Sequence, residues 1–332
     1  MKAAMKDATK DATKEATKEA TSGHWASINE SSFVLGMRLL FWVCRVFGRW
    51  PFRVILYPVL TWYVLAKPAA RRASSTYLTH MRAFAPAPSG LFGVLRHFGA
   101  FAESILDKML LWGGLFDTSK VTMHGLAPML RMLDEKRGAV LLCSHLGNTD
   151  LCRVLSHAQQ GLKLTVLVHT RHAKAFNEMM AALDPRSQMN LMQVTEMTPA
   201  TAMLLSEKVA QGEFVVIAGD RIPVSPNPRV AVVPFLGQSA AFPVGPYVLA
   251  GILQCPLCLM VAVHGKDGYE IHFEQLSDNV RLPRKGRDEA LAVLAAAYAA
   301  RLQHYAVRSP LEWFNFYDFW HLPDLDKKHA SC

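Results

Sequence analysis

Two short runs of apolar residues constrain the fold of this chain more than any other feature. Val140 to Cys143 follows the turn signal Lys136-Arg137-Gly138, and Phe214 to Ala218 comes shortly after Gly212; neither run contains a charged residue. Short apolar runs next to turn signals are typical of strands buried on both faces, as in parallel sheets. From Leu151 onward the spacing of apolar residues is helical, so a helix is expected to follow the first strand.

Strand-like and helix-like segments alternate along the rest of the chain. Further strands are expected at 121–124, 164–168, 192–194 and 230–235, and as a hairpin of 257–263 with 269–273. Helices are expected at 91–111, 126–133, 173–183, 199–211, 243–253 and 287–307. This alternation predicts an α/β fold with a central, mostly parallel, mixed sheet flanked by helices.

The residues after the first apolar run carry the clearest chemical signal. His145 and Asp150 are five positions apart, so on one continuous helix of ~3.6 residues per turn they would point about 140° apart and could not touch. They meet only if His145 lies in a loop and Asp150 in a first helical turn, with Gly147 permitting the bend and Asn148 or Thr149 capping the helix. Asp150 would then orient the imidazole as a general base. A surface histidine beside a helix-capping aspartate has the same spacing.

Charged residues follow two other predicted strands. Arg171 comes after 164–168, and Asp220 and Arg221 come after 214–218. Ligands in open α/β sheets bind outside the carboxyl ends of the strands, so parallel strands would bring these residues and His145 to one crevice. Arg171 would bind a phosphate or an oxyanion there, unless it is simply solvated, and Asp220 and Arg221 could instead form a structural ion pair.

Four sequence motifs resemble those of the late acyltransferases of lipid A biosynthesis, in the lysophospholipid acyltransferase superfamily. They keep that family's order across roughly residues 25–320, and they are SHLGNTD (144–150), GEFVVIAGDRIP (212–223), PFLG (234–237) and WFNFYDFW (313–320). The resemblance implies that His145 and Asp150 form the catalytic H-x4-D/E dyad. It further implies that Arg171 stands at a position after the strand where the family keeps a basic residue. It also implies that Asp220 and Arg221 shape the acceptor site and hold a charged headgroup.

The chain departs from the pattern of this family and its relatives in two places, and both bear on the identity of the acceptor. Many lipid A members have glutamate where this chain has Asp150, and that difference, with the aromatic ending, looks more like the branch that accompanies aryl polyene or related lipid pathways. The Glu-Gly-Thr-Arg motif of related enzymes is missing, which argues against glycerol 3-phosphate as the acceptor.

The expected activity is therefore O-acyl transfer, from acyl carrier protein or acyl-CoA to a hydroxyl of a lipid or lipid precursor. His145 would be the general base, and the backbone N–H groups of Gly147 and Asn148, with Arg171, would stabilise the oxyanion. No G-x-S-x-G motif is present, so direct transfer is favoured over an acyl-enzyme, and no cofactor or metal is expected. The basic chain favours the acidic carrier protein as donor.

Two other classes of function remain open at this point. A metal-dependent hydrolase would use His145 and Asp150 with His169 and His172, whose H-x-x-H spacing suits chelation on a helix. A catalytically inactive membrane-binding or scaffold protein of the same fold would keep the motifs without turnover. The six cysteines lie mostly in apolar patterns and are expected to be free thiols, the lone CxxC of Cys255 and Cys258 included.

The amino-terminal quarter has a different composition. Residues 1–22 are a low-complexity lysine-rich arm, expected to be disordered or loosely helical. Residues 23–82 carry eight basic residues against one acidic residue, yet they are rich in Phe, Trp, Leu and Val and have no nucleic-acid-binding motif. An anionic membrane surface is the partner that fits both properties.

The apolar parts of that segment are 33–48, interrupted by Arg38 and Arg45, and the charge-free 54–66. Neither reaches the ~20 residues that span a bilayer, so a helical hairpin dipping into the cytoplasmic face of the inner membrane is expected. Helices packed on the soluble domain, or one transmembrane helix, are the alternatives. Residues 83–322 would form the catalytic domain and 323–332 a tail, with the aromatic run Trp313 to Trp320 packed on the core.

Overall fold

The computed structural model describes residues 42–151, 154, 162–168, 189–193, 198–223 and 228–322. The chain divides into two compact units, residues 1–55 and 56–332, and all that follows on the sheet and its surroundings concerns the second. The predicted arm, the tail 323–332, the start of the apolar segment 33–48, the helix 173–183 and the residues His169, Arg171 and His172 lie outside the described residues.

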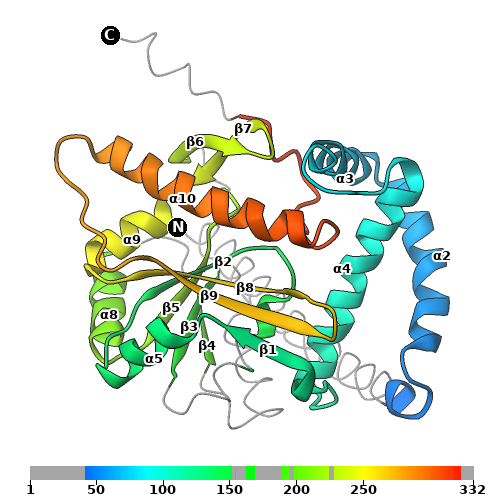
Figure 1. Cartoon of the computed structure of the whole chain (residues 1–332), viewed down its shortest axis with the longest axis horizontal. Coiled ribbons are helices and arrows are strands. Elements are labelled where there is room, and N and C mark those ends of the chain that lie inside the picture. Colours follow the sequence, from blue (N-terminus) through cyan, green and yellow to red (C-terminus); the bar gives the residue numbers. More distant parts are fainter. Residues whose placement is uncertain are drawn as a thin grey trace, which may run out of the picture. The chain divides into compact units, whose positions relative to one another are not determined.

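A seven-stranded sheet forms the centre of the second unit (Figure 1). Its order is β1-β9-β8-β2-β5-β3-β4, and every neighbouring pair is parallel except β8 and β9. The strands are β1 (Val121–His124), β2 (Val140–Cys143), β3 (Leu164–Val168), β4 (Met189–Gln193), β5 (Phe214–Ala218), β8 (Leu257–His264) and β9 (Tyr269–Ser277). The predicted α/β class with a mixed, mostly parallel sheet is confirmed.

The helices fall close to their predicted positions. Residues 42–47 are helical, and the α-helices with described bounds are α2 (Trp50–Ala66), α3 (Pro68–Met81), α4 (Gly90–Trp112), α5 (Ala127–Asp134), α8 (Pro199–Ala210), α9 (Gly245–Leu253) and α10 (Arg287–Arg308). Short 3-10 helices occupy Thr118–Lys120 (η1) and Thr149–Leu151 (η2). Among the described residues, no helix combines the length and apolar character needed to cross a bilayer.

One strand was missed. After β6 (Val230–Phe235), residues 238–242, for which no element was predicted, and Pro243, predicted as the first helical residue, form β7 (Gln238–Pro243), which pairs with β6 in a separate antiparallel hairpin. Leu236 and Gly237 form the two-residue turn with positive φ angles of 49° and 76°. Such a turn matches the twist of an antiparallel pair, so it returns the chain alongside β6 rather than into a helix.

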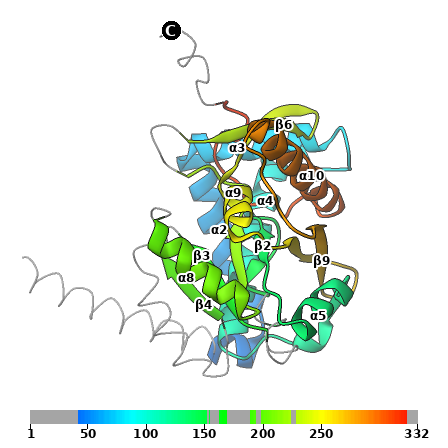
Figure 2. The ribbon, with the colours of Figure 1, turned by 90° about the vertical axis from the view of Figure 1, so that its left-hand side faces the viewer.

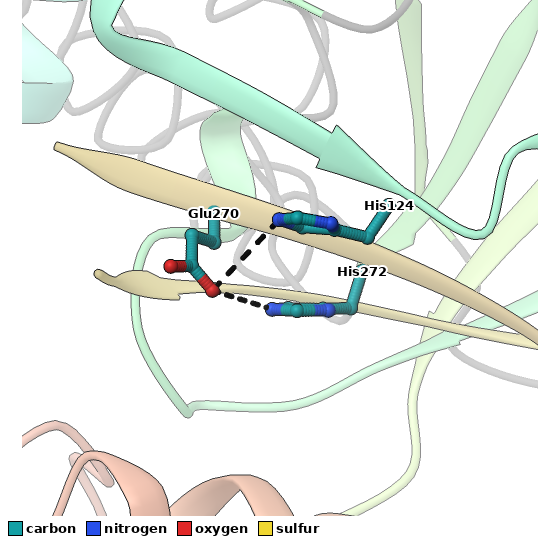
Figure 3. A group of neighbouring side chains, drawn as sticks. All are labelled: His124, Glu270 and His272. Carbon is teal, nitrogen blue, oxygen red and sulfur yellow. Dashed lines mark hydrogen bonds and ion pairs between the residues drawn. The ribbon is translucent and has the colours of Figure 1, made fainter. Parts of the chain in front are cut away.

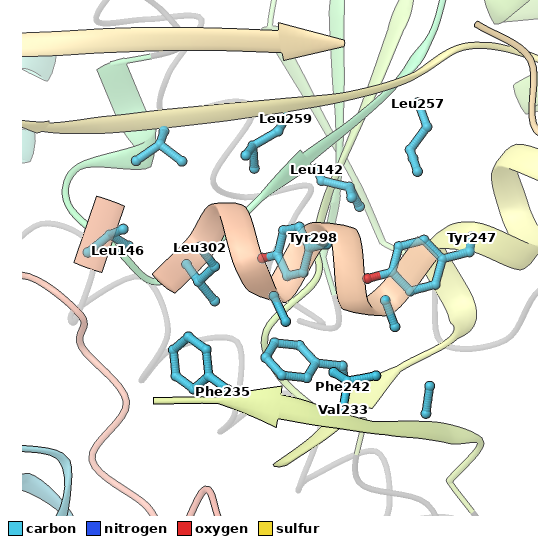
Figure 4. Close-up of a cluster of buried hydrophobic side chains, with 14 of the residues drawn as sticks. Leu142, Leu146, Val233, Phe235, Phe242, Tyr247, Leu257, Leu259, Tyr298 and Leu302 are labelled. Atoms are coloured by element: carbon cyan, nitrogen blue, oxygen red, sulfur yellow. The ribbon is translucent and has the colours of Figure 1, made fainter. Parts of the chain in front are cut away.

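The apolar strands are buried on both faces, as predicted from their lack of alternation. Side chains of β2 alternate between two core clusters: Val140 and Leu142 in the larger one, Leu141 and Cys143 in the smaller. The larger cluster fills the space between the sheet, α10 and the β6–β7 hairpin (Figure 4). Figure 2 shows α8 and α9 on one side of the sheet and α5 on the other, so helices cover both faces.

The aromatic run at 313–320 packs on the core, as predicted. Trp313 is completely buried, Phe314 and Phe319 are nearly so, and Trp313 contacts the rings of Tyr77 and Phe235. The segment after α10 therefore crosses from that helix to the end of β2, where Leu146 and Trp313 form an antiparallel bridge. This bridge places the run beside His145.

Four cysteines lie within the described residues, and all four are free thiols: Cys44, Cys143, Cys255 and Cys258. Burial raises the pKa of Cys255 to about 11. Because metal ligation and disulfide exchange both need the thiolate, the buried Cys255 and Cys258 behave as core residues.

Candidate active site

The register of two parallel strands brings His145 and Asp220 together. β2 and β5 are neighbours, and Cys143 at the end of β2 is paired with Ala218 at the end of β5. His145 and Asp220 each come two residues after that pair, so both lie at the same point beyond the sheet edge. The prediction that the ends of these strands meet at one site is confirmed.

The two side chains form a short contact. Nδ1 of His145 is 2.8 Å from Oδ1 of Asp220, and the backbone N–H of His145 donates to Oδ2 at 2.8 Å. The imidazole is about one third exposed, at 31%, whereas the carboxylate is completely buried. Because a carboxylate accepts, Nδ1 carries the proton and Nε2 is left as the basic nitrogen on the open side of the ring.

The aromatic run supplies the remaining hydrogen bonds to Asp220. Its Oδ2 accepts from Trp313 Nε1–H at 3.0 Å and from Asn315 Nδ2–H at 3.2 Å. Burial raises the pKa of Asp220, but the charge and hydrogen bonds of His145 and the bond from Trp313 outweigh it, so the pKa lies below its ordinary value. Asp220 is therefore a buried anion whose oxygens are all satisfied.

The buried side chain of His97 is hydrogen-bonded to the backbone of the aromatic run. Its Nε2 is 2.9 Å from the carbonyl oxygen of Trp313, and its Nδ1 is 2.9 Å from the hydroxyl oxygen of Ser74. Since the carbonyl can only accept, Nε2 carries the proton and Ser74 donates to Nδ1. Burial lowers the pKa of His97 to about 4, against the opposing hydrogen bond with Trp313, so this ring is neutral near pH 7.

Gly147 makes the bend that the sequence predicted. Its φ is +68°, and a Cβ there would lie 1.8 Å from the carbonyl oxygen of Ala262, so only glycine fits. The side chain of Asn148 accepts the N–H of Asp150 at 3.2 Å, as expected of a capping residue. The next turn, η2, follows directly.

In the same bend, the two backbone N–H groups that were expected to bind the oxyanion are already hydrogen-bonded to backbone carbonyls. The N–H of Gly147 donates to the carbonyl of Glu312 and the N–H of Asn148 to that of Ala262, each at 2.8 Å. These bonds attach the loop to β8 and to the segment after α10. The prediction that Gly147 and Asn148 stabilise an oxyanion through these N–H groups does not match this geometry.

Asp150 has a different partner from the one predicted. Its Oδ2 is 2.8 Å from Nζ of Lys108 on α4, and both side chains are mostly buried. The η2 turn directs the carboxylate toward α4, while Asp220 occupies the Nδ1 position of His145. The predicted contact of Asp150 with the imidazole is thus replaced by an ion pair with Lys108.

Arg221 does not pair with Asp220 among the described contacts. Its Nε donates to Oδ1 of Asn315 at 2.8 Å and its Nη2 to the carbonyl of Phe314 at 3.0 Å. Arg221 thus braces Asn315, which in turn donates to Asp220. Arg171, the other predicted basic residue, lies outside the described residues.

Comparison with known families agrees with the resemblance drawn from the four sequence motifs. A family model described as bacterial lipid A biosynthesis acyltransferase matches residues 117–320, well over half of the chain. The chain belongs to this family. The match includes β1 through α10, His145, Asp220 and the aromatic run, so this lipid A biosynthesis-type acyltransferase acts with an acyl donor and a lipid acceptor. No curated protein matches the chain.

The resemblance noted from the motifs is thereby confirmed at the level of the family. Trp313, Asn315 and His97 were not predicted as site residues. Trp313 and Asn315 belong to the WFNFYDFW motif, whose residues could have been examined for hydrogen-bond donors, whereas nothing in the local sequence around His97 marks its role.

Proposed function

We propose that the enzyme transfers a fatty acyl group from a thioester donor to a hydroxyl of a lipid acceptor, with His145 as general base and Asp220 as its orienting acid. The observation that carries this proposal is the 2.8 Å contact between a partly exposed imidazole and a buried carboxylate. A positioned carboxylate fixes the tautomer of a catalytic histidine and stabilises the imidazolium that forms.

The proton and acyl group move in two linked steps. Nε2 of His145 takes the proton of the acceptor hydroxyl as that oxygen attacks the thioester carbonyl, which forms a tetrahedral oxyanion. When the oxyanion collapses, the C–S bond breaks, the ester forms, and the imidazolium returns its proton to the leaving thiolate. Throughout, Nδ1–H remains bonded to Asp220, so the positive charge is held 2.8 Å from a fixed anion.

Arg171 is the proposed group for the oxyanion, since the N–H groups of Gly147 and Asn148 are engaged by backbone carbonyls. Asp150 lies on the stretch directly after His145, and its ion pair with Lys108 of α4 fixes the start of η2 beside the base. We assign Asp150 to that positioning role.

The experiment that tests the base follows thiol release and ester formation with an acyl-carrier-protein or acyl-CoA donor, and with both a lipid A precursor and hydroxylated lipids of aryl polyene or related pathways as acceptors. H145Q is expected to lower kcat by roughly 10³–10⁴-fold, as loss of a catalytic histidine does in acyl transfer. H304Q, at an exposed histidine of α10, is the matched control and keeps the wild-type rate. A folded H145Q variant that transfers acyl groups at the wild-type rate, or a wild-type protein that transfers none, would contradict the proposal.

The same enzyme is proposed to work at the cytoplasmic face of the inner membrane. On α2, Leu60 and Val64 are buried against Val94 and Phe98 of α4, one turn apart, while Trp62 is 68% exposed. The other exposed apolar residues of α2 and α4 within the second unit are Tyr57, Val59, Tyr63, Leu65, Leu91 and Phe92. An exposed apolar surface with Trp and Tyr fits the interfacial region of a bilayer.

Vesicle flotation tests the membrane assignment. V59S is expected to weaken binding to vesicles containing anionic phosphatidylglycerol, because Val59 is 55% exposed on that surface. V293S, which removes the same side chain from an exposed position on α10, is the matched control. Equal binding by both variants and the wild-type protein would place the contact elsewhere.

For the donor, the net charge of +9 favours the acidic carrier protein over CoA. Electrostatic attraction between two macromolecules weakens with salt. The rate with acyl carrier protein is therefore expected to fall more steeply with added salt than the rate with acyl-CoA, and parallel salt profiles would contradict the preference. The acceptor proposed from the Asp150 departure is a hydroxylated lipid of an aryl polyene or related pathway, tested by lipid mass spectrometry of a deletion strain.

A further inference from the structure

Three side chains on the edge of the sheet converge away from the residues assigned to acyl transfer. They are His124 at the end of β1 and Glu270 and His272 on β9 (Figure 3). One ligand atom of each lies within 4.8 Å of the others. None of the three was singled out from the sequence, because His124 and His272 are 148 positions apart.

Strand register explains the convergence. β1 and β9 are parallel, and His124 is the register partner of His272. Glu270 precedes His272 by two residues, so all three side chains leave the same face of the sheet. The imidazole rings are stacked with 4.7 Å between centroids and 13° between planes, and Figure 3 shows a nitrogen of each ring directed at the Glu270 carboxylate.

We propose that His124, Glu270 and His272 bind a divalent transition-metal ion, with Zn²⁺ the best fit. Two imidazole nitrogens and one carboxylate oxygen are a ligand set that such ions use. Nε2 of His272 is 3.1 Å and Nε2 of His124 is 3.9 Å from Oε2 of Glu270. Ligand atoms about 2.1 Å from a tetrahedral ion are about 3.4 Å apart. The ring of His124 therefore needs to move toward Glu270 and His272, whose ligand atoms already lie within 4.8 Å of its own.

The surroundings suit an ion that is reached from solvent. The side chain of His124 is 46% exposed, that of Glu270 20% and that of His272 10%, so water completes the coordination on the open side. Arg308 of α10 also forms an ion pair with Oε2 of Glu270, and its own side chain is 46% exposed. A bound metal ion competes with this guanidinium, which swings into solvent when the site is filled.

The position of the site indicates what the ion does. β1 has four residues and, among the described strands, lies at the edge of the sheet with β9 as its one neighbour. A metal ion shared by His124 and the two β9 residues ties this edge strand to its neighbour. An ion that binds the folded state and not the unfolded chain raises stability. Because the site lies away from the residues assigned to acyl transfer, the ion is expected to stabilise the fold and not to take part in the reaction.

The test uses tag-free, full-length protein and Zn²⁺ itself. Metal is removed with a chelator, and Zn²⁺ binding is then measured by calorimetry and by metal content after desalting. One bound Zn²⁺ per chain is expected for the wild-type protein, with an affinity lowered about tenfold or more by H124Q, E270Q or H272Q. Co²⁺ bound in its place is expected to give a visible ligand-field absorption band that E270Q removes.

Two further variants make the outcome specific. H304Q on α10 is the matched control and keeps wild-type Zn²⁺ binding, while R308Q is expected to bind Zn²⁺ about threefold to tenfold more tightly because the competing cation is gone. Saturating Zn²⁺ is expected to raise the melting temperature of the wild-type protein but not of E270Q. Wild-type binding by H124Q, E270Q and H272Q, no binding by the wild-type protein, or binding lost only in H169Q/H172Q would each overturn the proposal. Acyl transfer by H145Q is a separate readout, so the two proposals fail independently.

Discussion

The two aspartates near His145 sit in contrasting surroundings. Asp220 is completely buried and accepts two hydrogen bonds from His145 and one each from Trp313 and Asn315. The side chain of Asp150 is 18% exposed and forms an ion pair with Lys108. Asp150 is only five positions from His145 and Asp220 is 75 positions away, yet Asp220 holds the imidazole. The reason is that the parallel neighbours β2 and β5 end side by side, whereas Asp150 is paired with Lys108 of α4.

The largest expected effect separates the catalytic roles of these two carboxylates. D220N is expected to lower kcat by roughly 10³–10⁴-fold, because an amide cannot stabilise the imidazolium and favours the wrong tautomer of His145. D150N keeps the loop and loses only the ion pair with Lys108, so a fall of about tenfold or less is expected. The check is the rate of acyl transfer at saturating donor. A greater loss in D150N than in D220N would return the orienting role to Asp150.

The second effect concerns stability. D220A is expected to lower the free energy of unfolding by about 3–5 kcal/mol, because buried donors from His145, Trp313 and Asn315 lose their acceptor. D150A removes one partner of a more exposed pair and is expected to cost about 1 kcal/mol. Urea unfolding of both variants, with the wild-type protein as reference, measures the difference. Equal costs would show that the hydrogen bonds around Asp220 add little.

A third effect depends on pH and comes from His97, which is hydrogen-bonded to Trp313, one of the donors to Asp220. The pKa of His97 falls from 6.5 to about 4 on burial, so the folded state excludes a proton that the unfolded chain binds. Its contribution is fully present above pH 6.5 and is lost as the pH falls toward 4, by about 3 kcal/mol in total. H97Q is expected to flatten that slope in urea unfolding at several pH values. The pKa of Asp220 is lowered too, so its own loss comes below pH 4.

The smallest expected effect tests a single donor. W313F keeps an aromatic ring in the core but removes the N–H that bonds to Oδ2 of Asp220, while three donors remain. A loss of about 1–2 kcal/mol, or roughly tenfold in kcat, is expected. F319L, which changes another buried ring of the same run without removing a donor to Asp220, is the control. A larger loss in F319L would mean that packing rather than the hydrogen bond sets the rate.

Much of this arrangement could be predicted from the sequence. The buried strands β2 and β5, their parallel direction and the meeting of His145 with Asp220 and Arg221 at one edge follow from apolar runs and from the rule for open sheets. Gly147 was correctly predicted as the bend, because glycine readily adopts the positive φ that this turn requires.

The partners of the site residues were harder to predict. Whether Asp150 turns toward His145 or toward Lys108 depends on the direction of one helical turn, and spacing does not determine it. The donors to Asp220 other than His145 come from Trp313 and Asn315, more than 90 positions away on the segment after α10. The hairpin strand β7 was missed because Pro243 and the apolar residues after it have helical spacing, which conceals the strand before them.

The bridge between Leu146 and Trp313 has a consequence for biosynthesis. The ribosome must translate through Asn315 before Asp220 gains its last hydrogen-bond donors, although His145 emerges at less than half of the chain length. The hydrogen bonds that hold Asp220 are therefore completed only after the last strand of the sheet, β9, has been made.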